Sequence, residues 1–474
     1  MTAPVCKWIT ILSLACQLGE AATLKRLYVE PFTTNAGAGK LRAHTVAELR
    51  KLSSISLVDE ESKADLILGG GGEIWVKGYQ SLNPRSGRMP YDGTPVYAGY
   101  LSVELRDKYG DTLWSYLVTP GAGSEDISKQ LSKRIVKHVA EALDQTETPF
   151  RTALLPQPKT ILKGAGATFP QPVYAKWFTN YRRENPNLEI TYNPVGSEAG
   201  VRKLLAGEVD FGASDSPEAI HEIAPSQEKN YLFVPSVVGA VVPIVNLPGL
   251  SGEIAFTPEA LSGIYLGKIK KWNDPLLRQA NPGVRLPDLD IVVVHRSDGS
   301  GTSYTFTDFL SKTSPAWKTQ IGAGLDPKWL TGRAANGNDG VAQLVKEFGG
   351  SIGYVEFIYA LRNHLSFGKV RNNHGELVEA SLESLAVAAR QCVRMTDDLK
   401  VSIVNAPAAG AYPIASFTWF VVPAHIPGDG KRNAITGFLK WMLGPGQTQA
   451  AALGYLPLPK EIVSKAQAAI ATIH

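Results

Sequence analysis

A short run of glycines and hydroxyls beside one arginine is the part of this chain whose residue types best suit chemistry. Residues 291–310 read Ile-Val-Val-Val-His-Arg-Ser-Asp-Gly-Ser-Gly-Thr-Ser-Tyr-Thr-Phe-Thr-Asp-Phe-Leu, which predicts an apolar strand, a turn and a helix. Glycines let the backbone approach a ligand, the first N–H groups of a helix lack partners, and Arg296 offers a planar fork of donors. These groups suit a tetrahedral oxyanion. An ordinary strand-turn-helix, capped by Asp298 or Ser300, is the alternative interpretation.

Two further segments have the same character. Gly164-Ala-Gly-Ala-Thr-Phe-Pro170 precedes a helical run from Val173 to Tyr181, and Val195-Gly-Ser-Glu-Ala-Gly-Val201 leads into a short amphipathic stretch. Each would direct free N–H groups and a hydroxyl toward one point. Because three positive helix ends suit a multiply charged anion better than one does, we expect an anion site to which three helices contribute.

These segments resemble the substrate-binding proteins of high-affinity phosphate ABC transporters, the periplasmic phosphate-binding protein family. The resemblance runs from about residue 160 to the C-terminus, and its segments occur in the order that the family has. They are Gly164–Trp177, Val209-Asp-Phe-Gly-Ala-Ser-Asp215, Ile264-Tyr-Leu-Gly-Lys-Ile-Lys-Lys-Trp-Asn273, Arg296-Ser-Asp-Gly-Ser-Gly-Thr302, and Gly337-Asn-Asp-Gly340 with Ile352-Gly-Tyr-Val-Glu356.

The resemblance implies a set of residues that hold phosphate from two sides. From one lobe these are Thr168, Phe169, Ser197 and Asp215, and from the other they are Arg296, Ser300, Gly301 and Thr302. Asp298 stands where the family uses an aspartate to orient the arginine, although it is also a reasonable helix cap. The resemblance implies no catalytic residue, no metal and no cofactor.

Asp215 is informative because an anion receptor has no obvious use for a second negative charge. Phosphate at neutral pH retains a proton that a carboxylate can accept, whereas sulfate has none to give. With sulfate, two negative oxygens in contact would cost on the order of 5 kcal/mol at an effective dielectric of about 20. Asp215 would therefore select phosphate by rejecting sulfate. Alternatively, it only caps the turn Asp215-Ser216-Pro217.

Glu198 departs from the family, which commonly has small residues after the serine. A carboxylate in the first turn of a helix interacts favourably with the positive helix end. We expect the side chain of Glu198 to point toward solvent, away from the anion.

Alternating apolar strands and amphipathic helices indicate an α/β protein, and the resemblance implies a two-lobed periplasmic-binding-protein (type II) fold with a hinge. The crossings between the lobes are expected near Val241–Val245 and Tyr412–Phe417. Lobe 1 would comprise about 160–242 plus 415–474, and lobe 2 about 243–414, with the ligand between them.

A separate small α+β domain is predicted over residues 23–143. Its expected elements are the apolar stretch Leu24–Pro31, a helix over Leu41–Leu52, strands over Ile55–Val58 and Ala64–Val76, a hairpin over Tyr97–Leu117 and a helix over Asp126–Leu143. The pattern is similar to small envelope domains such as that of the Tol translocation propeller protein. Gly69–Gly72 lacks the Lys-Ser or Lys-Thr of a phosphate-binding loop, so a β-bulge or turn is expected there.

Residues 1–22 look like a secretory signal peptide, and 144–159, with three prolines, like a linker. A lipid anchor at Cys16 is not favoured, because leucine is displaced from its usual place in the cleavage motif. We expect a periplasmic or cell-envelope location.

The net charge of +4 over 474 residues is small and scattered, which argues against nucleic acid as a partner. Removal of the signal would leave Cys392 alone, and no zinc-ligand spacing is present.

The predicted function is capture of inorganic phosphate and its delivery to the membrane permease and ATPase subunits of an ABC transporter. One alternative is an envelope scaffold or sensor that binds an envelope partner through the N-terminal domain. A phosphatase with Ser300 as nucleophile is less favoured, because His295 should lie on the opposite face of its strand from Arg296.

Overall fold

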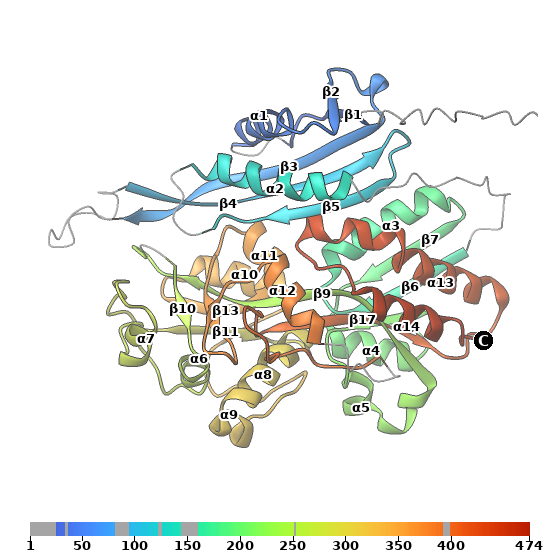
Figure 1. The fold of residues 1–474 in the computed structure, drawn as a ribbon. Helices are drawn as coiled ribbons and strands as arrows, with labels where there is room; N and C mark the ends of the chain where they lie inside the picture. The colour runs from blue at the N-terminus through green and yellow to red at the C-terminus, as the bar shows by residue number, and fades with distance from the viewer. Residues whose placement is uncertain are drawn as a thin grey trace, which may run out of the picture.

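The computed structural model describes most of the chain, and Figure 1 shows it as a small N-terminal domain resting on a larger two-lobed body. The described residues are 25–33, 37–80, 94–121, 126–143, 160–250, 253–391 and 399–474. The predicted signal peptide and linker and Cys392 lie outside them. Among these residues, no helix combines the length and the apolar character that a bilayer crossing requires.

The N-terminal domain is a five-stranded sheet in the order β2-β1-β3-β4-β5, with two helices on one face. Its elements are β1 (Lys25–Val29), α1 (Ala38–Leu49), β2 (Ile55–Val58), η1 (Glu61–Lys63), β3 (Leu66–Gln80), β4 (Thr94–Asp107), β5 (Thr112–Val118) and α2 (Ile127–Leu143). Leu101, Val103 and Leu105 alternate along β4 and are fully buried in the core that the helices cover. The strands and helices predicted for this region occur in the predicted order, with ends that differ by a few residues.

The prediction of a bulge or turn at Gly69–Gly72 is wrong. These glycines lie in the regular part of β3 and pair in register with β4, and the irregularity comes later, between Val76 and Gly78. The glycines are needed for close packing instead. A Cβ on Gly72 would lie 2.8 Å from Leu41 of α1, and one on Gly70 would lie 2.7 Å from the Ser102 carbonyl oxygen.

The two-lobed body is built on one nine-stranded sheet in the order β12-β11-β13-β9-β17-β8-β6-β7, with β14 paired to β9. We define lobe 1 as residues 160–240 plus 415–474. Its elements are β6 (Thr160–Gly166), α3 (Gln171–Glu184), β7 (Leu188–Asn193), α4 (Ser197–Leu205), β8 (Phe211–Ser214), α5 (Ala219–Ile223), η2 (Pro225–Asn230), the first part of β9 (Tyr231–Asn246), β17 (Ala415–Pro423), α13 (Asp429–Met442), η4 (Pro445–Gln449), η5 (Ala451–Leu453) and α14 (Lys460–Ile470).

Lobe 2 comprises residues 241–414. Its elements are the end of β9, β10 (Ala255–Phe256), α6 (Pro258–Tyr265), α7 (Pro275–Ala280), β11 (Val292–Arg296), α8 (Gly301–Thr313), α9 (Pro315–Gln320), β12 (Arg333–Ala335), α10 (Gly337–Glu347), β13 (Ser351–Glu356), α11 (Phe357–Arg362), β14 (Ser366–Phe367), β15 (Lys369–Arg371), β16 (Leu377–Val378) and α12 (Leu382–Ala389). A separate three-stranded sheet has the order β10-β15-β16.

Strand β9 carries the chain from one lobe to the other. Up to Ala240 it pairs antiparallel with β17 of lobe 1, and from Val241 onward it pairs antiparallel with β13 of lobe 2. The chain returns just before Ala415, where β17 begins, and the Tyr412 hydroxyl there donates to the Val241 carbonyl oxygen at 2.9 Å. Both crossings are buried, so the strands that join the lobes also belong to the core.

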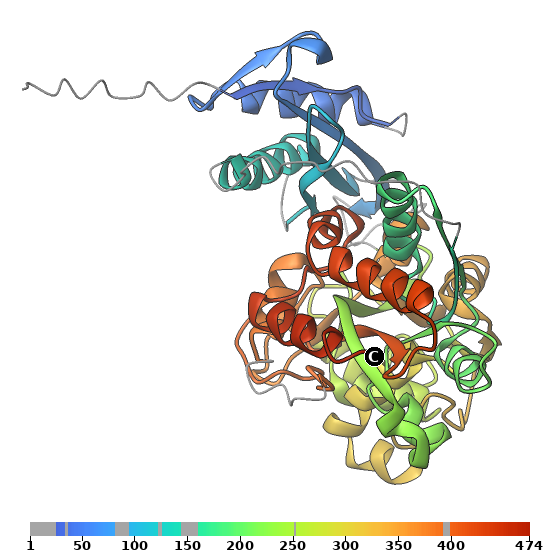
Figure 2. The ribbon, with the colours of Figure 1, turned by 90° about the vertical axis from the view of Figure 1, so that its right-hand side faces the viewer.

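The N-terminal domain contacts both lobes through the sheet face that its helices leave free (Figure 2). On lobe 1, Ser102 Oγ donates to the carbonyl oxygen of Ala452 at 2.7 Å. On lobe 2, Glu73 lies 2.9 Å from His364 Nε2, and the ring of Trp75 stacks on that imidazole with centroids 4.6 Å apart. The sheet face is therefore occupied by the protein's own lobes.

Helix α4 packs closely against the end of β6 at the point where Gly200 faces Gly166. A Cβ on Gly200 would lie 2.2 Å from Gly166 Cα and 2.6 Å from the Ala165 carbonyl oxygen, both of which are backbone atoms that cannot move aside cheaply. The contact fixes α4, and with it Ser197 at its start, against the central sheet.

We expect Gly200→Ala to lower the free energy of unfolding by about 1–3 kcal/mol, because the new methyl group overpacks a backbone contact. Urea unfolding of the full chain measures this. Gly430→Ala is the matched control, since Gly430 also lies in a helix and has no atom within 4 Å of an added Cβ. Equal stability of the two variants would contradict the packing argument.

Candidate functional site

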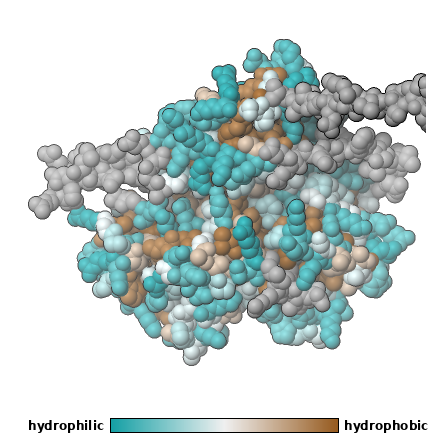
Figure 3. All heavy atoms as spheres, in the orientation of Figure 1, coloured by the Kyte–Doolittle hydropathy of each residue, from teal (hydrophilic) through white to brown (hydrophobic). Residues whose placement is uncertain are grey.

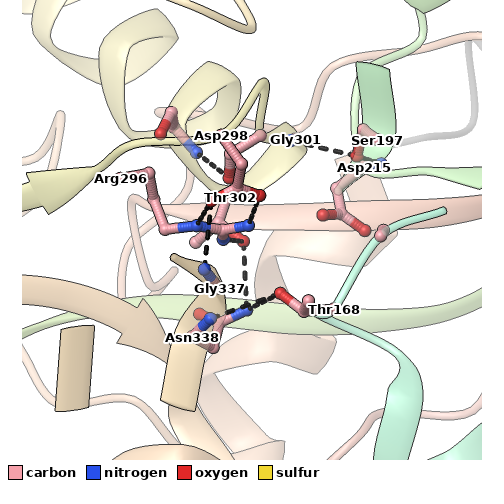
Figure 4. Close-up of polar contacts among 12 residues, drawn as sticks. Thr168, Ser197, Asp215, Arg296, Asp298, Gly301, Thr302, Gly337 and Asn338 are labelled. Atoms are coloured by element: carbon pink, nitrogen blue, oxygen red, sulfur yellow. Dashed lines mark hydrogen bonds and ion pairs between the residues drawn. The ribbon is translucent and has the colours of Figure 1, made fainter. Parts of the chain in front are cut away.

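Four helices begin at one place between the lobes. Helices α3 and α4 come from lobe 1, as the sequence predicts, and α8 comes from lobe 2. The fourth is α10, whose first residues Gly337 and Asn338 donate to Asp298 and Thr168 respectively (Figure 4). This segment carries part of the family resemblance, but no residue of it was expected at the site. Converging helix N-termini carry partial positive charge and suit an anion.

The hydroxyls expected at the site all accept hydrogen bonds from N–H groups. Thr168 Oγ1 accepts from Asn338 Nδ2 at 2.8 Å, and Ser197 Oγ accepts from the Gly301 N–H at 3.0 Å. Ser300 is the N-cap of α8, and its Oγ accepts from the Ser303 N–H at 3.1 Å.

Thr302 Oγ1 likewise accepts hydrogen bonds from Arg296 Nη1 and Asn338 Nδ2, both at 3.4 Å. A hydroxyl that accepts from N–H groups keeps its own proton to donate. The four hydroxyls are thus arranged as donors.

Arg296 is buried, and its guanidinium is held by Asp298. Nε donates to Asp298 Oδ1 at 2.7 Å, Nη2 pairs with Oδ2, and the arginine side chain is 1% exposed. Asp298 Oδ1 also accepts from the Gly337 N–H at 3.0 Å. Asp298 is therefore not the cap of α8; it orients the arginine and joins it to the start of α10. These interactions hold the pKa of Asp298 below its usual value even though burial opposes the charge.

Asp215 follows strand β8 and faces the converging donors. It is 1% exposed, and its Oδ1 is buried without a hydrogen-bond partner in the described part of the chain. Burial raises the pKa of Asp215 to about 7, while Thr418 and Arg296 act in the opposite direction by a smaller amount. A buried unpaired carboxyl oxygen is costly unless a donor reaches it. The site thus combines many donors with one unsatisfied acceptor.

Phe169 can offer a ligand only its backbone, since its side chain is apolar and fully buried. The ring lies against Gly239 of β9, where an added Cβ would come within 2.5 Å of it. All eight residues expected to bind the anion are thus brought into one region between the lobes, with Asp298 beside them. Their role as phosphate ligands remains a prediction.

The lobes are in contact at this region, so the structure is a closed form. In addition to the hydrogen bond from the Gly301 N–H to Ser197 Oγ, the Glu198 N–H donates to the Gly299 carbonyl oxygen at 3.0 Å. The Glu198 side chain turns toward Arg202 on the next turn of α4, at 2.7 Å. It lies in the first helical turn, as expected, but it packs on the other lobe, because a Cβ on Gly299 would lie 2.1 Å from Glu198 Oε2.

His295 does not reach the site. Its imidazole stacks on Trp329 with centroids 4.9 Å apart, and its Nδ1 lies 3.0 Å from the backbone oxygen of Arg296. Burial lowers its pKa. His295 and the Arg296 guanidinium lie on opposite sides of β11, as the strand pattern predicts.

Several polar residues around the site were given no role by the sequence, although Asn338 and Glu356 lie in segments that carry the family resemblance. Asn338, Tyr359, Glu356 and Tyr455 are all buried and contact the Thr168–Phe169 segment directly or through one another. A pattern of neighbouring residues could not reveal them, because Asn338 and Thr168 are separated by 170 positions in the chain.

Comparison with known proteins gives consistent results. A family model described as a PBP superfamily domain matches residues 139–445. The phosphate-binding protein PstS of Pasteurella multocida is 40% identical over 318 residues, which cover 67% of this chain and 91% of that protein. The PstS protein of Methanocaldococcus jannaschii is 34% identical over 331 residues, covering 65% of this chain and 85% of that protein.

Solved structures support the fold. A phosphate-binding protein from Stenotrophomonas maltophilia aligns with a TM-score of 0.50 at 22% identity, covering 65% of this chain and 94% of that one. A human phosphate-binding apolipoprotein aligns with a TM-score of 0.51 at 20% identity, covering 65% of this chain and 93% of that one. The body of the protein has the two-lobed type II periplasmic-binding-protein fold. The chain therefore belongs to the PBP superfamily and, within it, to the family of PstS phosphate-binding proteins.

Proposed function

We propose that this protein binds inorganic phosphate between its lobes and delivers it to the permease of an ABC transporter. The observation that carries the proposal is the unpaired Asp215 carboxyl oxygen, which faces hydroxyls and an arginine arranged as donors. An oxyanion that keeps a proton satisfies both sets of groups, since it accepts from the donors and donates to Asp215.

Delivery to a transporter follows from the family. Relatives that share about two thirds of this chain are named phosphate-binding proteins. The partners would be the permease and ATPase subunits, and the location would be the periplasm, where the predicted signal peptide would direct the protein. Release would require the lobes to separate.

Catalysis has less support than binding. A serine nucleophile needs an adjacent base. Ser300 Oγ is engaged as a helix cap, and the nearest histidine in sequence, His295, stacks on Trp329 away from the site. The role of an envelope scaffold also has less support, because the free sheet face of the N-terminal domain is covered by the lobes.

Asp215→Asn should relax the discrimination against sulfate. The amide can donate to an unprotonated oxygen, so the charge repulsion that rejects sulfate disappears. Isothermal titration with phosphate and sulfate at about pH 8.5, above the raised pKa of Asp215, measures the selectivity of the protein after bound ligand has been removed. Asp210→Asn is the control, because Asp210 pairs with Lys431 away from the cleft. Unchanged selectivity in Asp215→Asn would refute the proton-accepting role.

The discrimination against sulfate should also depend on pH. Because the pKa of Asp215 is raised to about 7, the carboxyl becomes neutral as the pH falls below that value, and it can then donate to sulfate. We expect sulfate affinity to rise by up to about tenfold per pH unit as the pH falls toward about 7, because binding there takes up one proton, and to level off below that value, where the free protein already carries the proton. Titrations between about pH 5 and 8.5 test this, and Asp215→Asn should remove the dependence. A flat profile in the wild type would contradict it.

Arg296→Ala should weaken phosphate binding by about 2–5 kcal/mol, since it removes a buried charge partner and leaves Asp298 unpaired. Arg296→Lys should lose less affinity, because it retains the charge but cannot span Asp298 and Thr302. Calorimetric titration gives both values. A loss below tenfold for Arg296→Ala would mean that the arginine serves only the structure of lobe 2.

A further inference from the structure

The segment Thr168–Phe169 of lobe 1 is held by polar side chains of lobe 2. The Tyr359 hydroxyl donates to the Thr168 carbonyl oxygen at 2.7 Å, and Asn338 Nδ2 donates to Thr168 Oγ1 at 2.8 Å. Asn338 is itself fixed, because its Oδ1 accepts from the Glu356 N–H at 2.9 Å. Each of these bonds crosses between the lobes or supports one that does.

A third link to this segment runs from the Glu356 carboxyl group through the Tyr455 hydroxyl. Tyr455 of lobe 1 lies with its hydroxyl 2.6 Å from the Phe169 carbonyl oxygen and 3.2 Å from Glu356 Oε2 of lobe 2. A tyrosine has one hydroxyl proton, and a carbonyl oxygen can only accept. The proton therefore belongs to the shorter contact with Phe169. For the contact between Glu356 and Tyr455 to be attractive as well, Glu356 must supply a proton.

The surroundings of Glu356 favour a neutral carboxyl group. The residue is fully buried, and no lysine or arginine forms an ion pair with it in the described part of the chain. Its Oε1 has no hydrogen-bond partner there, while Oε2 accepts from the Ile358 N–H at 3.0 Å. Burial raises the pKa of Glu356 well above its usual value, and the charge of Asp215 acts in the same direction.

We propose that Glu356 is a protonated positioning residue which, with Asn338, Tyr359 and Tyr455, couples closure of the lobes to the shape of the phosphate-binding segment Thr168–Phe169. This inference rests on the proposed function, since it specifies how that site is assembled. The hydrogen bonds run from the Glu356 carboxyl to the Tyr455 hydroxyl and from there to the Phe169 carbonyl oxygen.

The geometry of the peptide bond explains why this matters for an anion. In a trans peptide the C=O and the N–H point in opposite directions. The bond from Tyr359 to the Thr168 carbonyl oxygen therefore also fixes the direction of the Phe169 N–H, which is the only polar group that Phe169 can offer to a ligand besides its carbonyl oxygen. The Thr168 hydroxyl accepts a hydrogen bond from Asn338, so the proton of the Thr168 hydroxyl stays available for donation to a ligand.

Three buried tyrosines allow a matched test. Tyr359, Tyr455 and Tyr412 each donate to a backbone carbonyl oxygen, at 2.7, 2.6 and 2.9 Å respectively, but the partner of Tyr412 is Val241 at the crossing between the lobes. Each change to phenylalanine removes one comparable hydrogen bond. We expect Tyr359→Phe and Tyr455→Phe to weaken phosphate binding by about 5- to 10-fold, mainly through faster dissociation, and Tyr412→Phe by less than about 2-fold.

Glu356 is tested by a pair of substitutions. Glu356→Gln keeps a neutral group that can donate to Tyr455, although its NH2 cannot also accept from the Ile358 N–H as Oε2 does, so phosphate affinity should stay within about 3-fold of the wild type. Glu356→Leu removes the donor and the acceptor and should weaken binding by at least about 10-fold. An infrared difference spectrum between the wild type and Glu356→Gln, recorded above the pKa of Asp215, should show the loss of one protonated carboxyl band.

The measurements are phosphate affinity by calorimetry, dissociation rate by stopped flow, and melting temperature for the full-length chain. Equal loss of affinity in all three tyrosine variants, or a Glu356→Gln variant as weak as Glu356→Leu, would overturn the inference. A wild type that binds no phosphate would refute the proposed function instead. The Glu356→Gln spectrum tests the protonated state directly, even if Glu356→Leu does not fold.

Discussion

The constraint on which the site depends is the burial of the Asp215 carboxyl group with one oxygen unpaired. A buried carboxylate is costly by itself, and its raised pKa expresses that cost. The surrounding groups are nearly all donors, so under the proposed function the cost is offset by a ligand that accepts from them and gives a proton to Asp215. With Asp215 charged, such a site would disfavour fully deprotonated anions of similar shape.

The donors are arranged by hydrogen bonds rather than by sequence order. Each hydroxyl at the site receives an N–H bond, and Asp298 takes two guanidinium nitrogens of Arg296 and the Gly337 N–H. These bonds use the acceptor capacity of the hydroxyls and set the direction in which their protons point. Much of this pattern exists only in the closed form, because the bonds between Ser197 and Gly301 and between Asn338 and Thr168 join the two lobes.

The N-terminal domain adds a second connection between the lobes. Its sheet contacts η5 of lobe 1 through Ser102, and it contacts His364 of lobe 2 through Glu73 and Trp75. A further contact with lobe 2 comes from α2, where Arg134 lies 3.0 Å from Glu383 of α12. A hinge motion that separates the lobes must therefore alter at least one of these contacts, in addition to those in the cleft.

The sequence by itself determined the features that depend on near neighbours in the chain. The strand, turn and helix around Arg296, the capping of α8 by Ser300 and the pairing of Arg296 with Asp298 all arise within a few residues, so chain geometry fixes them. The family resemblance indicated which distant segments share a site. Only the tertiary structure decided the direction of each hydrogen bond, the roles of Asn338, Tyr359 and Glu356, and the regular strand at Gly69–Gly72. Those features depend on partners far away in the chain and on burial, which raises the pKa of Asp215 and of Glu356, and no local pattern specifies either.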